Sequence, residues 1–328
     1  MVTRPCLIAV LGLVWLSLAC SPLRAADQPD RIIISGASGQ LGELTIKELL
    51  RRGVDPRNLI LVSHTPEKLA EYVQRGATVR YGDLYKPETL AGAYAGGTRM
   101  LLISIGGASP TPRPLAHKSG FDAAVKAGVK HIVYTSFLGA DKAETPLVAE
   151  HQQSENYLKA SGAKWTMLRN GFYADLHLSA AIDMARTGAA TVPANAQKTA
   201  PVMRADCAAA AAGALLNPSM SENQTFDITG PELYDRRDVV KAVSAMTGKR
   251  IKATEEGPQP VDGAPGGADA PGGPGTASTP FVPLGPPAGT PSVVSNAVAR
   301  LSGRPAMGLR AMLEANKKQI LAAAGSRP

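Results

Sequence analysis

Residues 31–42 read Arg31-Ile-Ile-Ile-Ser-Gly-Ala-Ser-Gly-Gln-Leu-Gly42, so an apolar, β-branched run passes directly into three glycines spaced three residues apart. In a turn between a strand and a helix, Gly36 permits the tight bend, Gly39 lets the backbone approach a pyrophosphate, and Gly42 lets helix and strand pack closely. The N-terminus of the helix then faces the anionic groups. Glycines alone are weak evidence, because a purely structural turn is the alternative. The strand before them and the helix after them favour a dinucleotide-binding turn.

The sequence around this turn alternates short β-branched runs with helical patterns as far as Asn170, which is typical of parallel strands joined by right-handed crossovers. We therefore predict an α/β fold with a Rossmann-type, doubly wound parallel sheet. The expected strands are Ile32 to Ser35, Leu59 to Val62, Thr78 to Tyr81, Met100 to Ser104, His131 to Thr135 and Trp165 to Leu168. The expected helices are Leu41 to Arg52, Glu67 to Arg75, Pro87 to Ala93, His117 to Ala127 and Val148 to Ser161.

The second half of the chain is expected to add a small α/β cap over the strand ends. Residues 257–291 contain 19 Gly or Pro among 35, which exceeds the roughly 25–30% that already marks low complexity, and we interpret them as a mobile linker or lid. The predicted domains are therefore 27–256 for the Rossmann domain with its cap, 257–291 for the linker and 292–328 for a C-terminal helical segment. The predicted elements are a helix from Arg204 to Leu216, a strand from Thr225 to Ile228, a helix from Asp235 to Thr247 and a helical pattern from Met307 to Ala324 that docks on the cap.

Residues 1–26 are predicted to be an export signal. The apolar run from Cys6 to Ala19 is shorter than a straight helix needs to cross a hydrocarbon core of roughly 30 Å. Two fates are open for it, namely cleavage after Ala19 or Ala25, or lipidation of Cys20. The protein is therefore expected to be exported, as a periplasmic protein or a membrane-anchored lipoprotein. An uncleaved extension or a misassigned start codon is the remaining alternative.

Composition argues against several classes of protein. The net charge of +8 is spread along the chain and aromatic residues make up 5%, so the basic stripe and stacking surfaces of a nucleic-acid binder are missing. The other two cysteines, Cys6 and Cys20, lie in the predicted export signal, so Cys207 has no cysteine partner in the mature protein and no disulfide framework is predicted. His117, His131 and His177 lack the spacing of metal ligands, and we predict no metal. No Gly-x-Ser-x-Gly elbow is present, which removes the common serine hydrolases.

The end of the second predicted strand bears on the choice of dinucleotide. An NAD site usually carries an acidic residue about 20 residues after the glycines, where it binds the ribose hydroxyls. Residues 62–65 read Val-Ser-His-Thr, with no carboxylate to repel a 2′-phosphate. Ser63, His64 and Lys68 could bind that phosphate, so NADP(H) is favoured and NAD(H) stays open. The alternative is that these three are ordinary polar loop residues.

Several further motifs follow one another in an order typical of one family. With Gly36-Ala-Ser-Gly-Gln-Leu-Gly42 they cover Arg31 to Gly248, and this part of the chain resembles the NmrA-like branch of the atypical short-chain dehydrogenase/reductase family, in particular its bacterial NAD(P)H:quinone oxidoreductases. The motifs are Leu101-Leu-Ile-Ser104, Ala127-Gly-Val-Lys-His-Ile-Val-Tyr-Thr-Ser136, Glu150-His151 followed by Glu155, Leu168-Arg-Asn-Gly-Phe-Tyr173, and Arg204-Ala-Asp206 before an alanine run.

The resemblance implies a set of cofactor-binding residues. The glycine turn would hold the pyrophosphate, the loop from Ser63 to Lys68 the adenosine phosphate, and Ser104 to Gly106 the middle of the cofactor. Asn170 to Tyr173 would line the nicotinamide pocket, with Arg204 reaching in from the cap. Relatives often have Arg where His64 stands, and a largely neutral imidazole binds phosphate less well. The full set is Gly36, Ser38, Gly39, Gln40, Leu41, Gly42, Ser63, His64, Lys68, Asp83, Ser104, Ile105, Gly106, Asn170, Gly171, Phe172, Tyr173 and Arg204.

Two residues are candidates for acid catalysis. Better-known members of the family use a Tyr-x-x-x-Lys pair, which this chain lacks. The corresponding stretch is His151-Gln-Gln-Ser-Glu155, and His151 could donate a proton to a quinone oxygen. The alternative, which we favour, is a surface histidine paired with Glu155 four residues along the helix. Tyr173 is the second candidate, whereas Tyr134 is expected in the core.

The function predicted from these residues is NAD(P)H-dependent hydride transfer to a small-molecule electron acceptor, a quinone or a similar carbonyl compound. Such a transfer needs little acid catalysis, because the cofactor carries the chemistry. The main alternative is a non-catalytic, NADP(H)-sensing redox protein, since NmrA-like regulators also lack the tyrosine-lysine pair. A sugar-nucleotide or isomerising enzyme is less favoured for want of that acid/base pair. The oligomeric state stays open.

Overall fold

The computed structural model describes residues 30–106, 111–194, 197–256 and 290–325. Its centre is a seven-stranded sheet in the order β3-β2-β1-β4-β5-β6-β8, and each neighbouring pair of strands runs parallel. The predicted Rossmann-type fold is therefore confirmed. The strands are β1 (Ile32–Ser35), β2 (Leu59–Ser63), β3 (Thr78–Tyr81), β4 (Arg99–Leu102), β5 (His131–Phe137), β6 (Lys164–Asn170) and β8 (Gln224–Ile228).

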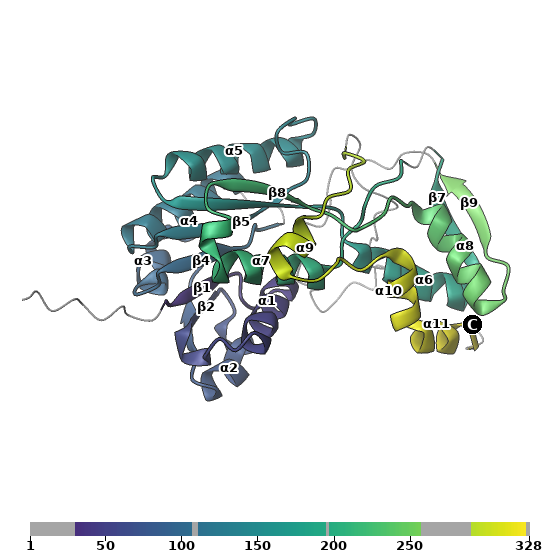
Figure 1. Cartoon of the computed structure of the whole chain (residues 1–328), viewed down its shortest axis with the longest axis horizontal. Coiled ribbons are helices and arrows are strands. Elements are labelled where there is room, and N and C mark those ends of the chain that lie inside the picture. Colours follow the sequence, from purple (N-terminus) through teal and green to yellow (C-terminus); the bar gives the residue numbers. More distant parts are fainter. Residues whose placement is uncertain (1–29, 107–110, 195–196, 257–289, 326–328) are drawn as a thin grey trace, which may run out of the picture.

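Helices cover both faces of this sheet (Figure 1), and β1 shows why its sequence is apolar at consecutive positions. Successive side chains of a strand point to opposite faces. Ile32 and Ile34 accordingly belong to one buried cluster and Ile33 to the other. The first cluster lies under α1 (Gln40–Arg51) and α7 (Arg204–Leu216), and the second lies under α3 (Leu90–Tyr94), α4 (Arg113–Lys126) and α5 (Pro146–Ala160).

The alanines of α7 let neighbouring helices approach closely. Ala208–Ala212 are all buried, and α7 packs between α1 and the C-terminal helix α9 (Ala297–Ser302). At Gly213 a methyl group would lie 1.8 Å from the carbonyl oxygen of Leu301, so only glycine fits there. The C-terminal part of the chain is thereby fastened to the sheet.

A smaller lobe stands beyond the carboxyl ends of the strands (Figure 1). It has its own buried cluster, in which α6 (Ala174–Thr187) packs against α8 (Arg236–Thr247) and the last two helices. Asp235 and Asp238 form a capping box at the start of α8, and Gly248 ends the helix in a left-handed conformation. The remaining elements are β7 (Ala189–Pro193), its parallel partner β9 (Lys252–Glu256), α10 (Leu309–Ala315) and α11 (Lys317–Gly325).

Part of the predicted cap belongs to the main domain instead. The helix from Arg204 and the strand from Thr225 were expected over the strand ends, but they are α7 and β8, which pack on and extend the seven-stranded sheet. Local sequence specifies a helix or a strand and leaves its neighbours undetermined. The pattern from Asp235 to Thr247 does lie in the smaller lobe, and the pattern from Met307 to Ala324 forms α10 and α11, which dock there as predicted.

Several predictions fall on residues outside the described ranges. These are the export signal with Cys20 and nearly all of the 257–291 segment. Thr290 and Pro291, at the end of that segment, are described, and Thr290 is buried. Among the described helices, none combines the length and apolar character needed to span a membrane.

Candidate functional site

The strand order reverses between β1 and β4, and the predicted glycine turn lies at that point. In open α/β sheets, ligands bind outside the carboxyl ends of the strands where the order reverses. Gly36 follows β1 with φ +90°, a conformation that favours glycine. At Gly42 a methyl group would lie 2.3 Å from the carbonyl oxygen of Gly36, so the turn and the first turn of α1 are in direct contact. Both glycines have the roles predicted from their spacing.

The first turn of α1 is suited to an anion. Gly39 is its N-cap and supplies no side-chain hydrogen bond. The Glu43 N–H donates to the Gly39 carbonyl, and this is the first backbone bond of the helix. The amides of Gln40, Leu41 and Gly42 precede it, as expected for the unpaired donors of a helix N-terminus. Free amides and the helix dipole together favour a phosphate at this place.

Three hydroxyl groups join the glycine turn to the end of β2. Ser38 Oγ lies 2.6 Å from Ser63 Oγ and 3.0 Å from Thr65 Oγ1. Ser63 is buried and also accepts the Thr65 N–H at 2.8 Å. His64 and Lys68 are exposed beside this cluster. The hydrogen bonds of this cluster join Ser38, Ser63 and Thr65 and involve no carboxylate.

The loop after β4 supplies the next predicted residues, Ser104 to Gly106. The Ser104 N–H donates to Thr135 Oγ1 at 2.8 Å, and the Thr135 hydroxyl donates to Ser104 Oγ at 3.2 Å. The Ile105 N–H donates to His117 Nε2 at 3.0 Å. Two consecutive amides of the loop thus point into the protein. The Ser104 hydroxyl accepts from Thr135, and no acceptor for its own proton is found in the described part of the chain, so this proton is available to a ligand.

The end of β6 and the start of α7 meet at Tyr173. The Arg204 guanidinium lies over the Tyr173 ring, 4.3 Å from its centroid, and Asp175 accepts the Arg204 N–H at 2.9 Å. Arg204 was expected to reach in from the cap, but it begins α7 on the main sheet. Burial raises the pKa of the Tyr173 phenol, so this group stays protonated at neutral pH.

Buried atoms without partners mark the same region. Asn170 Oδ1 and Arg204 Nε are two of the seven buried side-chain atoms that have no hydrogen-bond partner among the described residues. Such groups cost free energy unless a ligand or water satisfies them. The bound dinucleotide would meet the free amides of α1 at one end of the site and Asn170 with Arg204 at the other. The residues present therefore fit the cofactor that the glycine turn predicts.

The alternative that we favoured for His151 is wrong. His151 is 5% exposed and its Nδ1 lies 3.0 Å from the hydroxyl of Tyr134, which is core as predicted. Glu155 instead accepts two hydrogen bonds from Arg169, each 2.8 Å long. Helical spacing places His151 and Glu155 on one face of α5, but the Glu155 carboxylate binds the guanidinium of Arg169 on β6 instead. Burial lowers the pKa of His151 to about 3, so the imidazole is neutral at pH 7 and is a poor proton donor.

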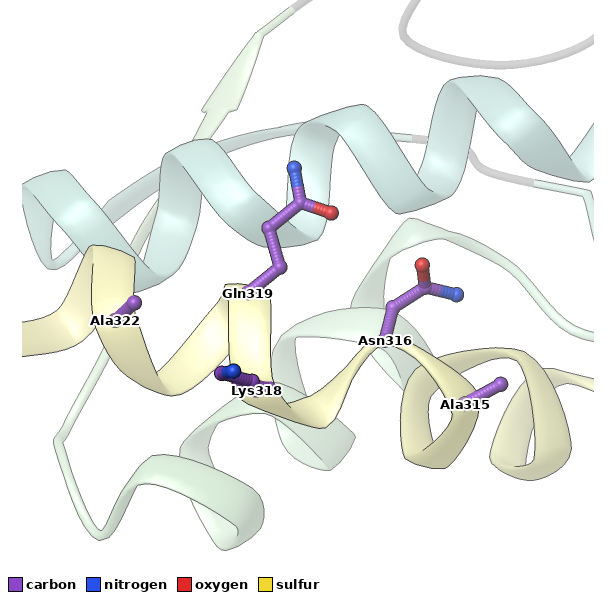
Figure 2. A pocket seen from close by; sticks show the side chains of 5 residues that line it. All are labelled: Ala315, Asn316, Lys318, Gln319 and Ala322. Atoms are coloured by element: carbon purple, nitrogen blue, oxygen red, sulfur yellow. The ribbon is translucent and has the colours of Figure 1, made fainter.

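Two further features are a predicted cofactor-binding residue, Asp83, and a surface hollow. The Asp83 carboxylate accepts the Tyr85 N–H at 2.9 Å and so closes the turn after β3. A surface hollow of about 430 Å³ lies on α10 and α11, lined by Asn316, Lys318 and Gln319 with two alanines (Figure 2). It contains none of the predicted site residues. Within the described ranges, no group of three or more His, Cys, Asp or Glu side chains could hold a metal ion.

Comparison with known proteins agrees with this geometry. The family model described as NAD(P)H-binding matches residues 36–218, more than half of the chain. The chain belongs to this NAD(P)H-binding family. It is 32% identical to quinone oxidoreductase 2 of Escherichia coli over 67% of its own length and 76% of that protein. The resemblance to an NAD(P)H-binding, reductase-containing family and the prediction of a nicotinamide cofactor are both confirmed.

One further relative and a crystal structure support the same family. An NmrA-like family domain-containing oxidoreductase of Aspergillus flavus is 27% identical over 68% of this chain and 73% of its own. The crystal structure of an NADPH-dependent quinone oxidoreductase from Escherichia coli, complexed with NADPH, superposes with a TM-score of 0.72 at 29% identity. That comparison covers 87% of this chain and 99% of the other. The NmrA-like branch named from the sequence motifs is therefore confirmed.

Sequence reasoning missed four residues that the structure brings to the site. Thr65 and Thr135 stand at or near strand ends, so the rule that ligands bind at carboxyl ends could have identified them. Asp175 lies two residues after the Tyr173 motif and holds Arg204. His117 was considered only as a metal ligand. Nothing in its neighbourhood in the sequence indicates that it bonds the loop twelve residues earlier.

Proposed function

We propose that this protein is an NADPH-dependent reductase that transfers hydride to a quinone or a similar electrophilic carbonyl compound. The observation that carries the proposal is a set of polar groups at the carboxyl ends of strands of one parallel sheet. The first amides of α1 follow β1, and Asn170 ends β6, shortly before Tyr173 with the Arg204 guanidinium over its ring. Quinone oxidoreductase 2 of Escherichia coli, to which the chain is similar in sequence and in structure, supports this class of acceptor.

The bound cofactor would supply hydride, and the protein would position it and its acceptor. The amides of Gln40 to Gly42 would bind the pyrophosphate. The Ser104 hydroxyl would donate a hydrogen bond to the cofactor, and Asn170 would accept one at Oδ1. Arg204 would stabilise the negative charge that develops on the acceptor oxygen. The oxygen then takes a proton from solvent or from the Tyr173 phenol.

Preference for NADPH over NADH is part of the proposal. The cluster of Ser38, Ser63 and Thr65 contains no carboxylate, and Lys68 lies exposed beside it. Titration calorimetry with NADPH and NADH should give the tighter binding for NADPH. Replacing Lys68 by Ala should weaken NADPH binding and leave NADH binding unchanged. Equal affinities in the natural protein would overturn this part.

Stopped-flow oxidation of NADPH in the presence of a series of quinones tests the reaction itself. Turnover with at least one quinone is expected, and Arg204→Ala should lower kcat more than it weakens NADPH binding. Binding of NADPH and NADP⁺ with different affinities, but without consumption of NADPH by any acceptor, would favour the redox-sensing alternative. Absence of binding to either nucleotide would contradict both.

We also propose that the protein is exported, from the apolar run between Cys6 and Ala19. Cleavage after Ala19 or Ala25 would release a periplasmic protein, and lipidation of Cys20 would anchor it to the membrane. Cell fractionation and sequencing of the mature N-terminus distinguish these outcomes. An intact Met1 in the cytoplasmic fraction would contradict export.

A further inference from the structure

A chain of buried side chains runs from the loop after β4 into the space between α4 and α5. It consists of His117 on α4, Tyr134 on β5, and His151 and Ser154 on α5, all 5% exposed or less. His117 Nδ1 lies 2.9 Å from Ser154 Oγ and 3.1 Å from the Tyr134 hydroxyl, which in turn lies 3.0 Å from His151 Nδ1. These groups belong to no predicted metal or cofactor contact.

The backbone fixes the direction of every hydrogen bond in this chain. The Ile105 N–H can only donate, so His117 Nε2 must accept and its proton must sit on Nδ1. Ser154 donates its own proton to the Glu150 carbonyl at 2.9 Å and therefore accepts from His117. The Tyr134 hydroxyl is then the donor to His151 Nδ1. One amide of the loop thus sets the tautomers of two histidines.

The same arrangement cannot relay a proton to the site. A relay would have to draw a replacement proton from the Ile105 amide, which does not ionise at physiological pH. Desolvation by burial lowers the pKa of His117 well below its ordinary value, so the ring stays neutral. A protonated ring would also direct an N–H at the Ile105 N–H. This network of buried side chains therefore holds the loop after β4 in one conformation.

Hydrogen bonds from two neighbouring elements hold the loop after β4. Thr135 on β5 accepts the Ser104 N–H and donates to Ser104 Oγ, while His117 on α4 accepts the next amide. The Ser104 hydroxyl proton is left free among the described residues, on the loop assigned to the middle of the cofactor. Removing either acceptor would leave a partly buried N–H without its partner, and the loop would have to turn to satisfy it.

We propose that His117 is a positioning residue for cofactor binding, because its Nε2 holds the Ile105 amide and so orients Ser104 and Gly106 toward the dinucleotide. The inference rests on the proposed function, since it assigns the loop to NADPH. It predicts that NADPH binding depends on a hydrogen-bond acceptor at the Nε2 position and not on the imidazole ring as such.

Two side-chain amides of different length, Gln and Asn at position 117, separate the acceptor position from the presence of the imidazole ring. In His117→Gln the side-chain amide reaches the Nε2 position and can accept the Ile105 N–H. In His117→Asn it reaches only the Nδ1 position, near Ser154. We expect H117N to raise the Kd and the KM for NADPH about ten-fold with kcat within about three-fold, because the partly buried Ile105 N–H loses its acceptor. H117Q should stay within about three-fold of the natural protein in both constants.

Tyr134→Phe is the matched control, because it removes the hydroxyl that contacts His151 Nδ1 and His117 Nδ1 and leaves the Ile105 bond to His117 Nε2 in place. It should leave the KM for NADPH within about two-fold, even if it lowers stability. Equal effects of H117N and H117Q, or an effect of Y134F as large as that of H117N, would overturn the proposal. Circular dichroism of each variant shows whether it has folded.

Nitrogen-15 NMR of the cofactor-free protein gives a readout that does not depend on activity. The shifts should show His117 protonated at Nδ1 and unprotonated at Nε2, and His151 protonated at Nε2. In H117N the Ile105 amide proton should exchange faster than in H117Q. The opposite tautomer at His117 would overturn the inference. With the expected tautomers, failure of the natural protein to bind NADPH would instead contradict the proposed function.

Discussion

Replacing Gly42 by alanine tests the contact between the glycine turn and α1. The added methyl group would lie 2.3 Å from the Gly36 oxygen and 2.8 Å from the Ala37 oxygen, both of them backbone atoms. We expect Gly42→Ala to push α1 away from the turn, destabilising the fold by about 1–3 kcal/mol and weakening NADPH binding about ten-fold. Urea denaturation and calorimetry measure the two effects.

Gly92→Ala in α3 is the control for this substitution. Gly92 is exposed, and an added methyl group would meet no atom within 4 Å. The variant should be unchanged or more stable by roughly 0.5–1 kcal/mol, with unchanged NADPH affinity. If G42A bound NADPH as tightly as G92A, the turn would not be the cofactor site.

Tyr173 permits a test of acid catalysis at a single oxygen atom. Because burial raises the pKa of its phenol, the group is a weak acid, and hydride transfer to a quinone needs little proton donation. We expect Tyr173→Phe to retain kcat within about ten-fold, whereas removal of a general acid costs about 10²–10⁴-fold. Tyr72→Phe, which deletes a buried hydroxyl without a partner among the described residues, is the control. A loss of about 100-fold in Y173F alone would make the phenol a general acid.

At the scale of elements, Asp206 fastens the C-terminal segment between the two lobes. Its buried carboxylate in the first turn of α7 accepts hydrogen bonds from Arg304 at 2.5 Å and from the Met307 N–H at 2.7 Å. The next residues enter the smaller lobe, where Glu232 accepts the Leu309 N–H at 2.7 Å. The segment therefore ties α7 to the cap.

Asp206→Asn keeps the shape of this side chain and removes its charge. We expect a loss of about 1–3 kcal/mol in the free energy of unfolding, because Arg304 loses its anionic partner. Amide hydrogen exchange should become faster between Arg304 and Leu309. Asp183→Asn removes an exposed pair with Arg186 on α6 and should cost less than about 1 kcal/mol. Unchanged exchange in D206N would contradict the role of Asp206.

At the scale of the whole molecule, buried histidines link stability to pH. Burial lowers the pKa of His131 and His177 to about 4 and that of His151 to about 3, and that of His117 lies well below its ordinary value. The unfolded chain therefore binds more protons than the folded one below the ordinary histidine pKa of about 6.5. Stability is fully present above that pH and is lost as the pH falls toward the folded pKa values.

We expect the free energy of unfolding to decrease between pH 7 and pH 5, by up to roughly 1.4 kcal/mol per pH unit for each buried histidine. Urea denaturation at several pH values measures the slope. His151→Gln should reduce it by the share of one histidine. His64→Gln, at an exposed position, should leave it unchanged. A slope that is the same in H151Q and the natural protein would show that His151 titrates alike in both states.

Local patterns in the sequence are enough to predict the glycine turn, the run of strands and helices as far as Asn170, and the nicotinamide cofactor. These depend on short-range properties: a β-branched run, glycines at fixed spacing and a helix start within twelve residues. Gly36 and Gly42 accordingly occupy the positions that their spacing predicted. The end of β2 could be predicted for the same reason, because Ser63 is adjacent in the sequence to the apolar run that forms the strand.

Tertiary packing alone decided where α7 and β8 lie, that Glu155 pairs with Arg169, and that the Ile105 amide bonds His117. Each of these depends on elements separated in the chain, whose meeting is set by the burial of both sheet faces and leaves no local pattern. Burial also reverses the chemistry expected of His151, because desolvation keeps neutral an imidazole that would be partly charged at the surface.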